Sequence, residues 1–336
     1  MEKITMGLRE FKLPDDLQLL LELIPPSFHY PENEDWNVDE DELENMVDSL
    51  SSAQRLWWLF RVMRLLSPPM RDILRGHIWE EAGKPVGVCN VLRQGATDCW
   101  LIGNVSVLPE YRRRGIARKL VQASVDYARS RDAKAVTLEV VDGNVPAYTL
   151  YADKLGFEPY SGNCQVVYET DALPDAVPLP EGYTVSECGL FEWQPRYELA
   201  RRITPDAVQQ YTPVTKKRYR QPPVVRAFAP LFIKLSGMKH KAFIVTRDSN
   251  GQVVASGGYD ARTQEGGLNG LRVSIDPEHG ELAPHLVQRF LRELLAAAPG
   301  RRVEASANHW QPATIAALEE AGFRKKFDYH TLGLLL

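Results

Sequence analysis

The feature that most constrains the fold of this chain is an order of elements that occurs twice along its 336 residues. In each half an apolar strand ends at a proline and is followed by a helix, a second apolar strand, and a helix that ends in Gly-Phe. Pro277 lies 168 positions after Pro109, and Gly322 lies 166 positions after Gly156. This spacing predicts two copies of one α+β fold rather than one large domain.

The best candidate for a boundary between the copies is TDALPDAVPLPEG at 170–182, because proline and acidic residues favour a linker. We therefore predict a first domain over 1–170, a linker over 171–182 and a second domain over 183–336. A hydrophobic content of 44% lets each domain bury a core.

Composition disfavours several classes of protein. A net charge of -4 with scattered basic residues argues against nucleic-acid binding. The cysteines form no CxxC pair and have no histidine at metal-ligand spacing, which predicts neither a metal site nor disulfides. No signal-peptide core occurs, and no run approaches the roughly 20 apolar residues of a membrane span. We expect a cytoplasmic protein with reduced thiols and no membrane contact, and the oligomeric state stays open.

In the first half, residues 4–12 predict a strand, and Pro14 begins a helix that Pro25-Pro26 should end. A second helix should run to about Leu66. Carboxylates cluster before it and in its first turns: Glu32, Glu34, Asp35, Asp39, Glu40, Asp41, Glu42 and Glu44. They either complement the dipole at a helix N-terminus or attract a cationic ligand.

Residues 77–94 predict a hairpin with its turn near Gly83. The following strand, which ends at Pro109, is apolar enough to be central in its sheet. A helix from Ile116 to about Arg131 and a strand at 135–141 come next. The last helix of this half has Pro146 in its first turn and ends at Gly156.

The turn after Pro109 is the strongest candidate for a ligand site. It contains Arg112, Arg113, Arg114 and Gly115 directly before the helix. A helix N-terminus presents unpaired N–H groups, glycine lets the chain approach a ligand closely, and arginines add charge-assisted contacts. The turn therefore predicts a phosphate-like anion site, although a solvated basic loop has the same composition.

Two motifs together point to a family. The first reads Arg112-x-x-Gly115-x-Ala117, and the second reads Asn144-x-x-Ala147-x-x-Leu150-Tyr151 with Gly156-Phe157 after it. The pair resembles the acyl-CoA-binding signature of the GCN5-related N-acetyltransferase (GNAT) superfamily over residues 1 to about 170. The run Leu138-Glu139-Val140, ahead of Asn144 and Tyr151, is similar to the corresponding run in the subfamily that acetylates protein N-terminal amines. The second half shares only the order of elements and the final Gly-Phe.

The resemblance implies two GNAT folds in tandem, each a mixed, mostly antiparallel sheet flanked by helices, with acetyl-CoA as co-substrate. It implies that the turn binds the CoA pyrophosphate through main-chain amides, and that the strand at 105–107 and Asn144 bind the pantetheine arm. The residues expected at the cofactor are Val105, Ser106, Val107, Arg112, Arg113, Arg114, Gly115, Ile116, Ala117, Arg118, Asn144, Ala147 and Tyr151.

The resemblance also implies two catalytic residues. Tyr151 would protonate the departing thiolate, and Glu139 would take a proton from the amine, which attacks a thioester only when neutral. A free N–H beside a bulge near Val105 would stabilise the oxyanion. Apart from the motif, Tyr151 is typical of helix packing, and Glu139 is typical of a strand-end carboxylate that pairs with an arginine.

The second copy differs where this chemistry would be. After Pro277 it has EHGELA, two residues shorter than EYRRRGIA, and Ala317 stands opposite Tyr151. We therefore expect a degenerate second domain and an active first domain that acetylates a small-molecule or peptide amine in a ternary complex. Two alternatives stay open: a non-catalytic acyl-CoA sensor or interaction protein, and an enzyme similar to mycothiol synthase, where the second domain is the active one.

Overall fold

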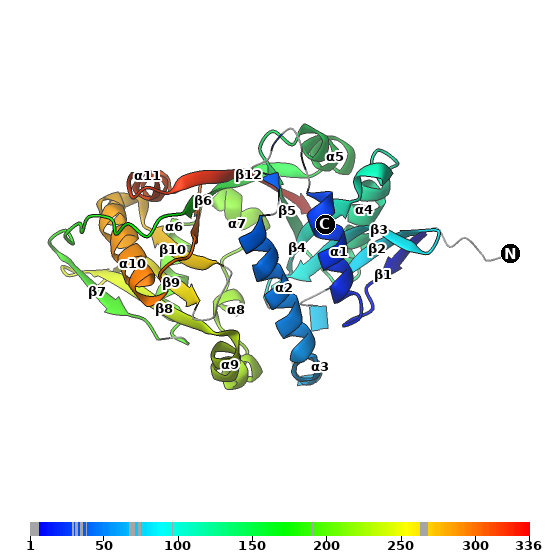
Figure 1. Ribbon diagram of the computed structural model, residues 1–336. Coiled ribbons are helices and arrows are strands. Elements are labelled where there is room, and N and C mark those ends of the chain that lie inside the picture. The colour runs from blue at the N-terminus through cyan, green and yellow to red at the C-terminus, as the bar shows by residue number, and fades with distance from the viewer. Residues whose placement is uncertain are drawn as a thin grey trace. The chain divides into compact units, whose positions relative to one another are not determined.

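The computed structural model describes residues 7–28, 30, 33, 36–37, 39–66, 71–72, 75–95, 97–189, 191–262 and 268–336. The chain divides into two compact units. The first contains Met1–Tyr160 and Thr331–Leu336, and the second contains Ser161–His330 (Figure 1). Both units have the predicted α+β composition of helices packed on a mixed sheet.

The sheet of the first unit begins with β1 (Gly7–Glu10), β2 (Arg75–Glu81), β3 (Lys84–Arg93), β4 (Cys99–Val107) and β5 (Ala135–Val141), in that order. The end of β12 (Arg324–Leu335) follows β5. Strands β1 to β4 pair antiparallel, whereas β4 and β5 pair parallel. Ala82 and Gly83 have φ of 52° and 76° and make the predicted hairpin turn. The predicted central position of β4 is confirmed.

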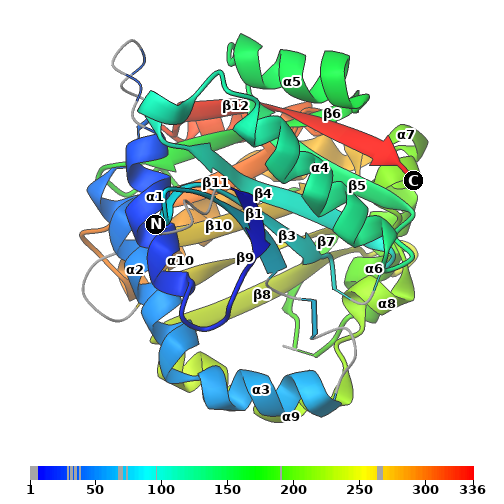
Figure 2. The same ribbon diagram turned by 90° about the vertical axis from the view of Figure 1, so that its right-hand side faces the viewer.

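Helices cover both faces of this sheet. On one face α4 (Ile116–Arg129) and α5 (Val145–Leu155) enclose a core that includes Trp100, Leu120 and Leu138. On the other face α1 (Leu17–Ser27) packs on Ile78 and Val88. Figure 2 shows α4 alongside the strands. We name the two surfaces the α4 face and the α1 face.

The early helices differ in detail from the prediction. Helix α1 continues through Pro25 and Pro26 to Ser27, although neither proline has a backbone N–H to donate. The Phe28 N–H closes the helix on the carbonyls of Ile24 and Pro25. Where the sequence predicted one second helix, the structure has two, α2 (Glu40–Arg55) and α3 (Trp57–Leu66).

Asp39 and Glu42 form a reciprocal capping box at the start of α2, with N···O distances of 2.9 and 3.1 Å. The helix-terminus interpretation of the acidic cluster is therefore confirmed for these two carboxylates. Glu32, Glu34 and Asp35 lie outside the described residues.

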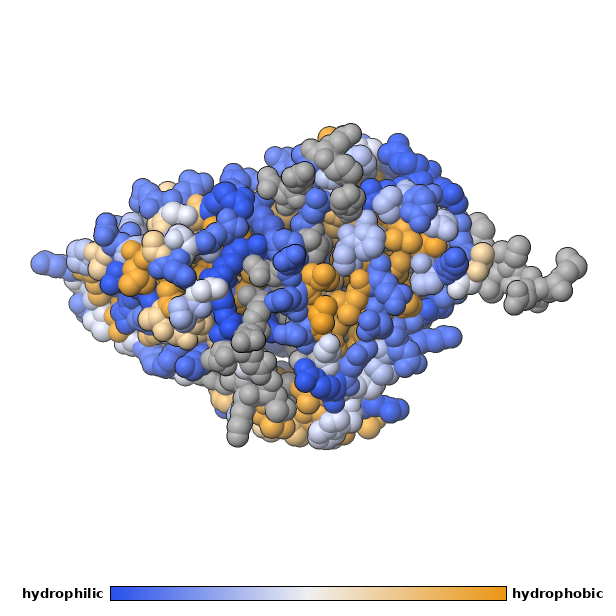
Figure 3. Space-filling view, viewed as in Figure 1, coloured by the Kyte–Doolittle hydropathy of each residue, from blue (hydrophilic) through white to orange (hydrophobic). Residues whose placement is uncertain are grey.

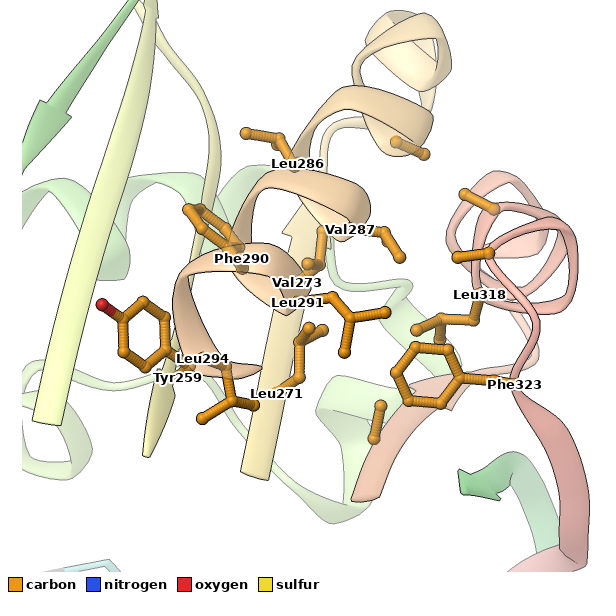
Figure 4. Packing of buried hydrophobic residues seen from close by; sticks show 14 of the residues in the cluster. Tyr259, Leu271, Val273, Leu286, Val287, Phe290, Leu291, Leu294, Leu318 and Phe323 are labelled. Atoms are coloured by element: carbon orange, nitrogen blue, oxygen red, sulfur yellow. The ribbon is translucent and has the colours of Figure 1, made fainter. Parts of the chain in front are cut away.

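The second unit repeats the fold. Its sheet runs β12, β6 (Glu158–Tyr168), β11 (Val303–Asn308), β10 (Asn269–Ile275), β9 (Val253–Arg262), β8 (Met238–Arg247) and β7 (Tyr183–Glu187). Its helices are α6 (Gln194–Ile203), α7 (Asp206–Tyr211), α8 (Lys216–Tyr219), α9 (Pro223–Ser236), α10 (Ala283–Ala297) and α11 (Pro312–Glu320). Figure 4 shows Phe290, Leu291 and Leu294 of α10 packing beside Leu271 and Val273 of β10.

The units are not the contiguous segments 1–170 and 183–336. Strand β6 begins in the first unit and belongs to the second from Ser161 onward, and the last six residues, Thr331–Leu336, belong to the first. Residues 171–182 lie between β6 and β7 as expected, but they attach to the second unit. Arg292 donates to the Pro174 carbonyl at 2.6 Å, and Leu179 packs on the second core.

The visible face of the molecule is mostly hydrophilic, with hydrophobic residues in separate groups (Figure 3). All four cysteines are buried, and none forms a disulfide. Within the described ranges, no three His, Cys, Asp or Glu side chains gather as a metal site would require. None of the described helices has the length and apolarity to cross a membrane.

Candidate active site

A bulge interrupts β4 at the predicted position. The pairing of β3 with β4 passes from Val88↔Ser106 to Asn90↔Gly103, so Asn104 and Val105 together oppose Cys89 alone. Asn104 has a left-handed φ of 48°, which fits the irregular residue of a bulge. The bulge near Val105 is thereby confirmed, and it leaves backbone there out of the regular ladder.

Strands β4 and β5 are paired over only part of their length. The parallel register contains Cys99↔Ala135, Trp100↔Val136 and Leu101↔Thr137. The segment Val105–Val107 therefore lies beyond the paired region, along an edge where an extended ligand can add main-chain hydrogen bonds. Val107 is buried on the α4 face, and Val105 packs partly against the same core.

The turn before α4 has two residues in the left-handed region. Arg113 has φ 64° and Gly115 has φ 76°, and Gly115 is the N-cap of the helix. A Cβ at Gly115 would meet no atom within 4 Å, so the space in front of it is open. The N–H groups of Ile116, Ala117 and Arg118 begin α4 and have no partner inside the helix. Together with the helix dipole they make an anion site.

The three arginines of the turn differ in the groups that they contact. Arg112 donates from Nη2 to the Ser27 carbonyl at 2.7 Å and from Nε to the Val107 carbonyl at 3.1 Å. Arg114 pairs with Glu81 at 3.2 Å. Among the described residues, Arg113 has no hydrogen bond or ion pair. Arg112 therefore braces the end of α1 against the end of β4, and Arg113 is the arginine best placed to meet a phosphate.

Tyr151 lies in the core beneath α5. Its side chain is 7% exposed, and its ring packs edge-on to Phe157 with centroids 6.4 Å apart. Burial raises the pKa of the Tyr151 hydroxyl well above its usual value, with smaller contributions from Cys89 and Tyr30. The hydroxyl forms no hydrogen bond to a described residue. It stays protonated at any ordinary pH and can serve only as a proton donor or a neutral hydrogen-bonding group.

Asn144 forms the N-cap of α5, where its Oδ1 accepts from the Ala147 N–H at 3.2 Å. The side-chain oxygen is thus used by the helix, and the amide nitrogen is the part suited to contact a ligand. Ala147 is half-buried against the core of the α4 face.

Glu139 is exposed on β5, whereas Leu138 and Val140 on either side of it are buried in the core of the α4 face. The alternation of strand side chains therefore places Glu139 on the α1 face. The predicted base and Tyr151 approach β4 from opposite faces of the sheet.

Sequence reasoning missed two aromatic residues of the segment between α1 and α2. The Arg112 guanidinium lies 5.6 Å from the centroid of the Tyr30 ring, and Tyr30 packs edge-on to Trp36 at 5.4 Å. A Cβ at Gly143, just after β5, would come within 3.5 Å of Trp36. These contacts place Tyr30 against the turn and Trp36 against the end of β5, and nothing in the periodicity of the sequence could have shown this.

Comparison with known proteins identifies the segment that carries this site. Residues 29–157 match the model of the acetyltransferase (GNAT) family. This segment is a GNAT-family domain. A Bacillus subtilis protein named putative [ribosomal protein bS18]-alanine N-acetyltransferase is 33% identical over 98 residues, 29% of this chain and 62% of that protein. N-alpha-acetyltransferase 30 of Schizosaccharomyces pombe is 38% identical over 69 residues, 20% of this chain and 45% of that protein. The chain thus spans less than two thirds of either relative.

Solved structures match both units. A GCN5-related N-acetyltransferase from Sphaerobacter thermophilus has a TM-score of 0.65 at 15% identity, over 98% of this chain and 95% of its own. A tandem GNAT protein from the clavulanic acid biosynthesis pathway has a TM-score of 0.63 at 16% identity, over 98% of each chain. At these identities the likeness shows the fold, which is two GNAT folds in tandem.

The second GNAT fold lacks the features of the first. Strands β9 and β10 pair in continuous register from Gly270↔Asp260 to Ile275↔Ala255, without a bulge. A short 3-10 helix, Pro277–Leu282, replaces the left-handed turn, and the Tyr183 hydroxyl bonds His279 Nδ1 there at 2.7 Å. Ala317 is buried at the place of Tyr151. Among the described residues, a bulge, a glycine turn and a tyrosine occur together in the segment at 29–157 and not in the second fold.

Proposed function

We propose that the first unit transfers an acetyl or other short acyl group from acyl-CoA to a primary amine, by direct attack in a ternary complex. The family supports acyl transfer, and both curated relatives are named as N-acetyltransferases. The observation that carries the proposal is Tyr151, which is buried, protonated and without a described hydrogen-bond partner beside the bulged strand. A module that only bound CoA would gain nothing from such a group.

Each part of acyl-CoA has a complementary part of the site. The pyrophosphate is assigned to the N–H groups of Ile116, Ala117 and Arg118, with the Arg113 guanidinium adding charge. The pantetheine arm is assigned to the open edge at Val105–Val107 and to the Asn144 amide at the start of α5. The thioester then lies at the bulge, between Glu139 and Tyr151.

In the reaction the amine nitrogen loses two protons and the departing sulfur gains one. Glu139, directly or through a water, takes a proton from the ammonium, and the amine nitrogen then attacks the thioester carbonyl carbon. A backbone N–H at the bulge stabilises the oxyanion, and loss of one such donor typically costs about 2.7 to 4 kcal/mol. The C–S bond breaks, the thiolate takes a proton from Tyr151, and the nitrogen releases its second proton to solvent, so that a neutral amide remains on the acceptor. Tyr151 regains its proton from solvent when CoA leaves.

Turnover with a panel of amines tests this function. The purified chain is incubated with acetyl-CoA and peptides beginning with Ala or Met, a lysine peptide with a blocked N-terminus, and an amino sugar, and thiol release is followed. The α-amine peptides are chosen from the names of the curated relatives and because an α-amine, with pKa near 7.7–8.0, is neutral far more often than a lysine near 10.4. We expect amine-dependent thiol release with at least one of them. Tight CoA binding without release on any amine would favour a sensor.

A further inference from the structure

One stretch of the first unit is basic and contains no carboxylate. Residues 49–71 have no Asp, Glu or Lys and contain the arginines Arg55, Arg61, Arg64 and Arg71, whereas the whole chain has 44 acidic and 40 basic residues. The stretch includes all of α3. The side chains of Arg55, Arg61 and Arg64 form no hydrogen bond or ion pair with any residue that the structure describes. Their positive charges are therefore not balanced within that part of the chain.

Helix α3 also exposes apolar side chains along one side. Trp58 is 62% exposed, Leu65 is 77% exposed, and Val62 between them is exposed as well. Residues three and four apart are neighbours on a helix, so these three side chains form one stripe, which we name the α3 stripe. Leu59 lies off the stripe and is buried. Arg61 is exposed, three residues after Trp58 and four before Leu65, so a cation borders the stripe.

The second unit has a segment of the same character at the equivalent place in chain order. Helix α3 precedes the hairpin of β2 and β3, and α9 precedes the hairpin of β8 and β9. Residues 207–247, which include α9, contain nine Lys and Arg residues and no Asp or Glu. Leu231 of α9 is exposed. The exposed cations ahead of it are Lys216, Lys217, Arg218, Arg220 and Arg226.

The two basic segments, 49–71 and 207–247, stand out against the rest of the chain. Outside them the chain has 27 basic and 44 acidic residues. Exposed apolar side chains grouped on one side of a helix indicate a contact surface, and the cations beside them indicate that the partner is anionic. The partner must therefore offer negative charge and an apolar region together.

The surface of an anionic lipid bilayer meets both requirements. Its headgroups attract lysine and arginine, and the boundary between headgroups and acyl chains accepts the apolar side of an amphipathic helix. Tryptophan is enriched at that boundary, and a long arginine side chain can keep its charge at the headgroups while its stem lies against apolar groups. RNA would attract the same cations but would leave the α3 stripe in water.

We propose that α3 docks on the surface of an anionic phospholipid bilayer, with Trp58, Val62 and Leu65 entering the boundary between headgroups and acyl chains. The arginines beside the stripe then lie at the headgroups, and the second basic segment has the composition for the same kind of contact. The expectation of no membrane contact rests on the absence of a spanning run, and a helix that lies on the surface needs none. Docking requires neither acyl-CoA nor an amine, so its test does not depend on the proposed function.

Vesicle sedimentation tests the docking with the full chain. The protein is mixed with vesicles of phosphatidylcholine alone or of equal parts phosphatidylcholine and phosphatidylserine, and the bound fraction is measured after centrifugation at low and at physiological salt. We expect at least about tenfold tighter binding to the anionic vesicles, and weaker binding as the salt concentration rises. No binding to the anionic vesicles, or equal binding to both kinds, would overturn the proposal.

Removing the apolar side chains tests the α3 stripe itself. Trp58→Ser combined with Leu65→Ser leaves every charge in place, and we expect its affinity for anionic vesicles to fall about tenfold or more, because less apolar area leaves water. Leu173→Ser is the matched control, since Leu173 is 56% exposed and lies outside both basic segments, and it should bind like the parent. Urea unfolding should show equal midpoints for all three proteins, because the replaced side chains are largely exposed. Unchanged vesicle affinity of the double variant would overturn the docking of α3.

Removing charges tests whether the attraction is local. Arg55→Gln combined with Arg61→Gln should weaken binding to anionic vesicles about tenfold. Arg129→Gln combined with Lys134→Gln removes the same charge from exposed positions elsewhere in the first unit and should weaken binding less than about threefold. Equal losses in the two pairs would mean that only the overall charge acts, which would overturn the assignment to α3.

Two other partners would give different results. If the parent is a dimer in analytical ultracentrifugation, the Trp58→Ser and Leu65→Ser variant is a monomer, and neither binds vesicles, the α3 stripe contacts a second copy of the chain. If single-stranded RNA binds the parent and this variant equally and neither binds vesicles, the arginines bind nucleic acid. Either result would overturn the proposal.

Discussion

At the scale of single residues, burial decides what each candidate can do. Tyr151 and Glu139 were both named from the sequence, yet one is buried on the α4 face and the other is exposed on the α1 face. Burial keeps a phenol protonated, whereas a carboxylate in contact with solvent can exchange protons with an incoming amine. These environments suit the acid role that we propose for Tyr151 and the base role that we propose for Glu139.

Tyr151→Phe should lower kcat about 10²-fold, because a positioned general acid typically contributes 10²–10⁴-fold. The Kd for CoA should stay within about twofold, since the ring still packs against Phe157. Because burial raises the pKa of Tyr151, kcat of the parent should not fall as pH rises through the ordinary tyrosine value of about 10. Tyr148→Phe, one turn earlier on α5, is the control, and steady-state kinetics with calorimetry are the measurements. Equal kcat for Tyr151→Phe and the parent would remove Tyr151 from catalysis.

A second residue-scale prediction concerns His77, which is buried with Nδ1 3.1 Å from Ser124 Oγ. Burial lowers the pKa of His77 below its unfolded value of about 6.5, so the unfolded chain binds the proton more tightly. Its contribution to stability is therefore complete above about pH 6.5 and is lost as pH falls through the folded-state pKa. Urea unfolding between pH 7.5 and 5 should show a slope of up to about 1.4 kcal/mol per pH unit from this group. The slope should diminish in His77→Gln, and an unchanged slope would contradict the assignment.

At the scale of elements, the turn before α4 contacts the end of α1, the helix that covers the α1 face. Through Arg112 it contacts the end of α1 and the ring of Tyr30, and Tyr30 packs on Trp36, which lies beside Gly143. Sequence motifs identified the turn because glycine and arginine spacing is local. They could not show that one of the three arginines donates to a carbonyl group 85 residues away in the chain.

Arg112→Ala and Arg113→Ala should therefore have different effects. Loss of Arg112 leaves two carbonyl partners and a ring contact unfilled, and we expect the free energy of unfolding to fall by about 1–3 kcal/mol. Loss of Arg113 should change stability by less than about 0.5 kcal/mol but weaken CoA binding about tenfold, because it removes a charge from the anion site. Denaturant unfolding and calorimetry with CoA distinguish the two. The reverse pattern would contradict the roles assigned here.

At the scale of the whole molecule, the repeat predicted most of the architecture. The hairpins, α4, α5 and their counterparts α10 and α11 lie where periodicity and turn residues placed them. The division into units was not predictable, because alternation tells which face of a strand is buried but not which sheet contains it.

The last six residues, Thr331–Leu336, belong to the first unit and should contribute to its stability. Leu332 is fully buried in the core of the α4 face, and the Leu336 N–H bonds the Lys134 carbonyl at 3.0 Å. Leu332→Ala should destabilise the first unit by about 2–5 kcal/mol, as for other buried leucines. Leu335→Ala, whose side chain is 49% exposed, is the control and should change stability by less than about 0.5 kcal/mol. The measurement is denaturant unfolding followed by CoA binding.

By the same argument a fragment of residues 1–175, which lacks the end of β12, should not unfold cooperatively. A stable, fully CoA-binding fragment would show that the first core is complete without that strand.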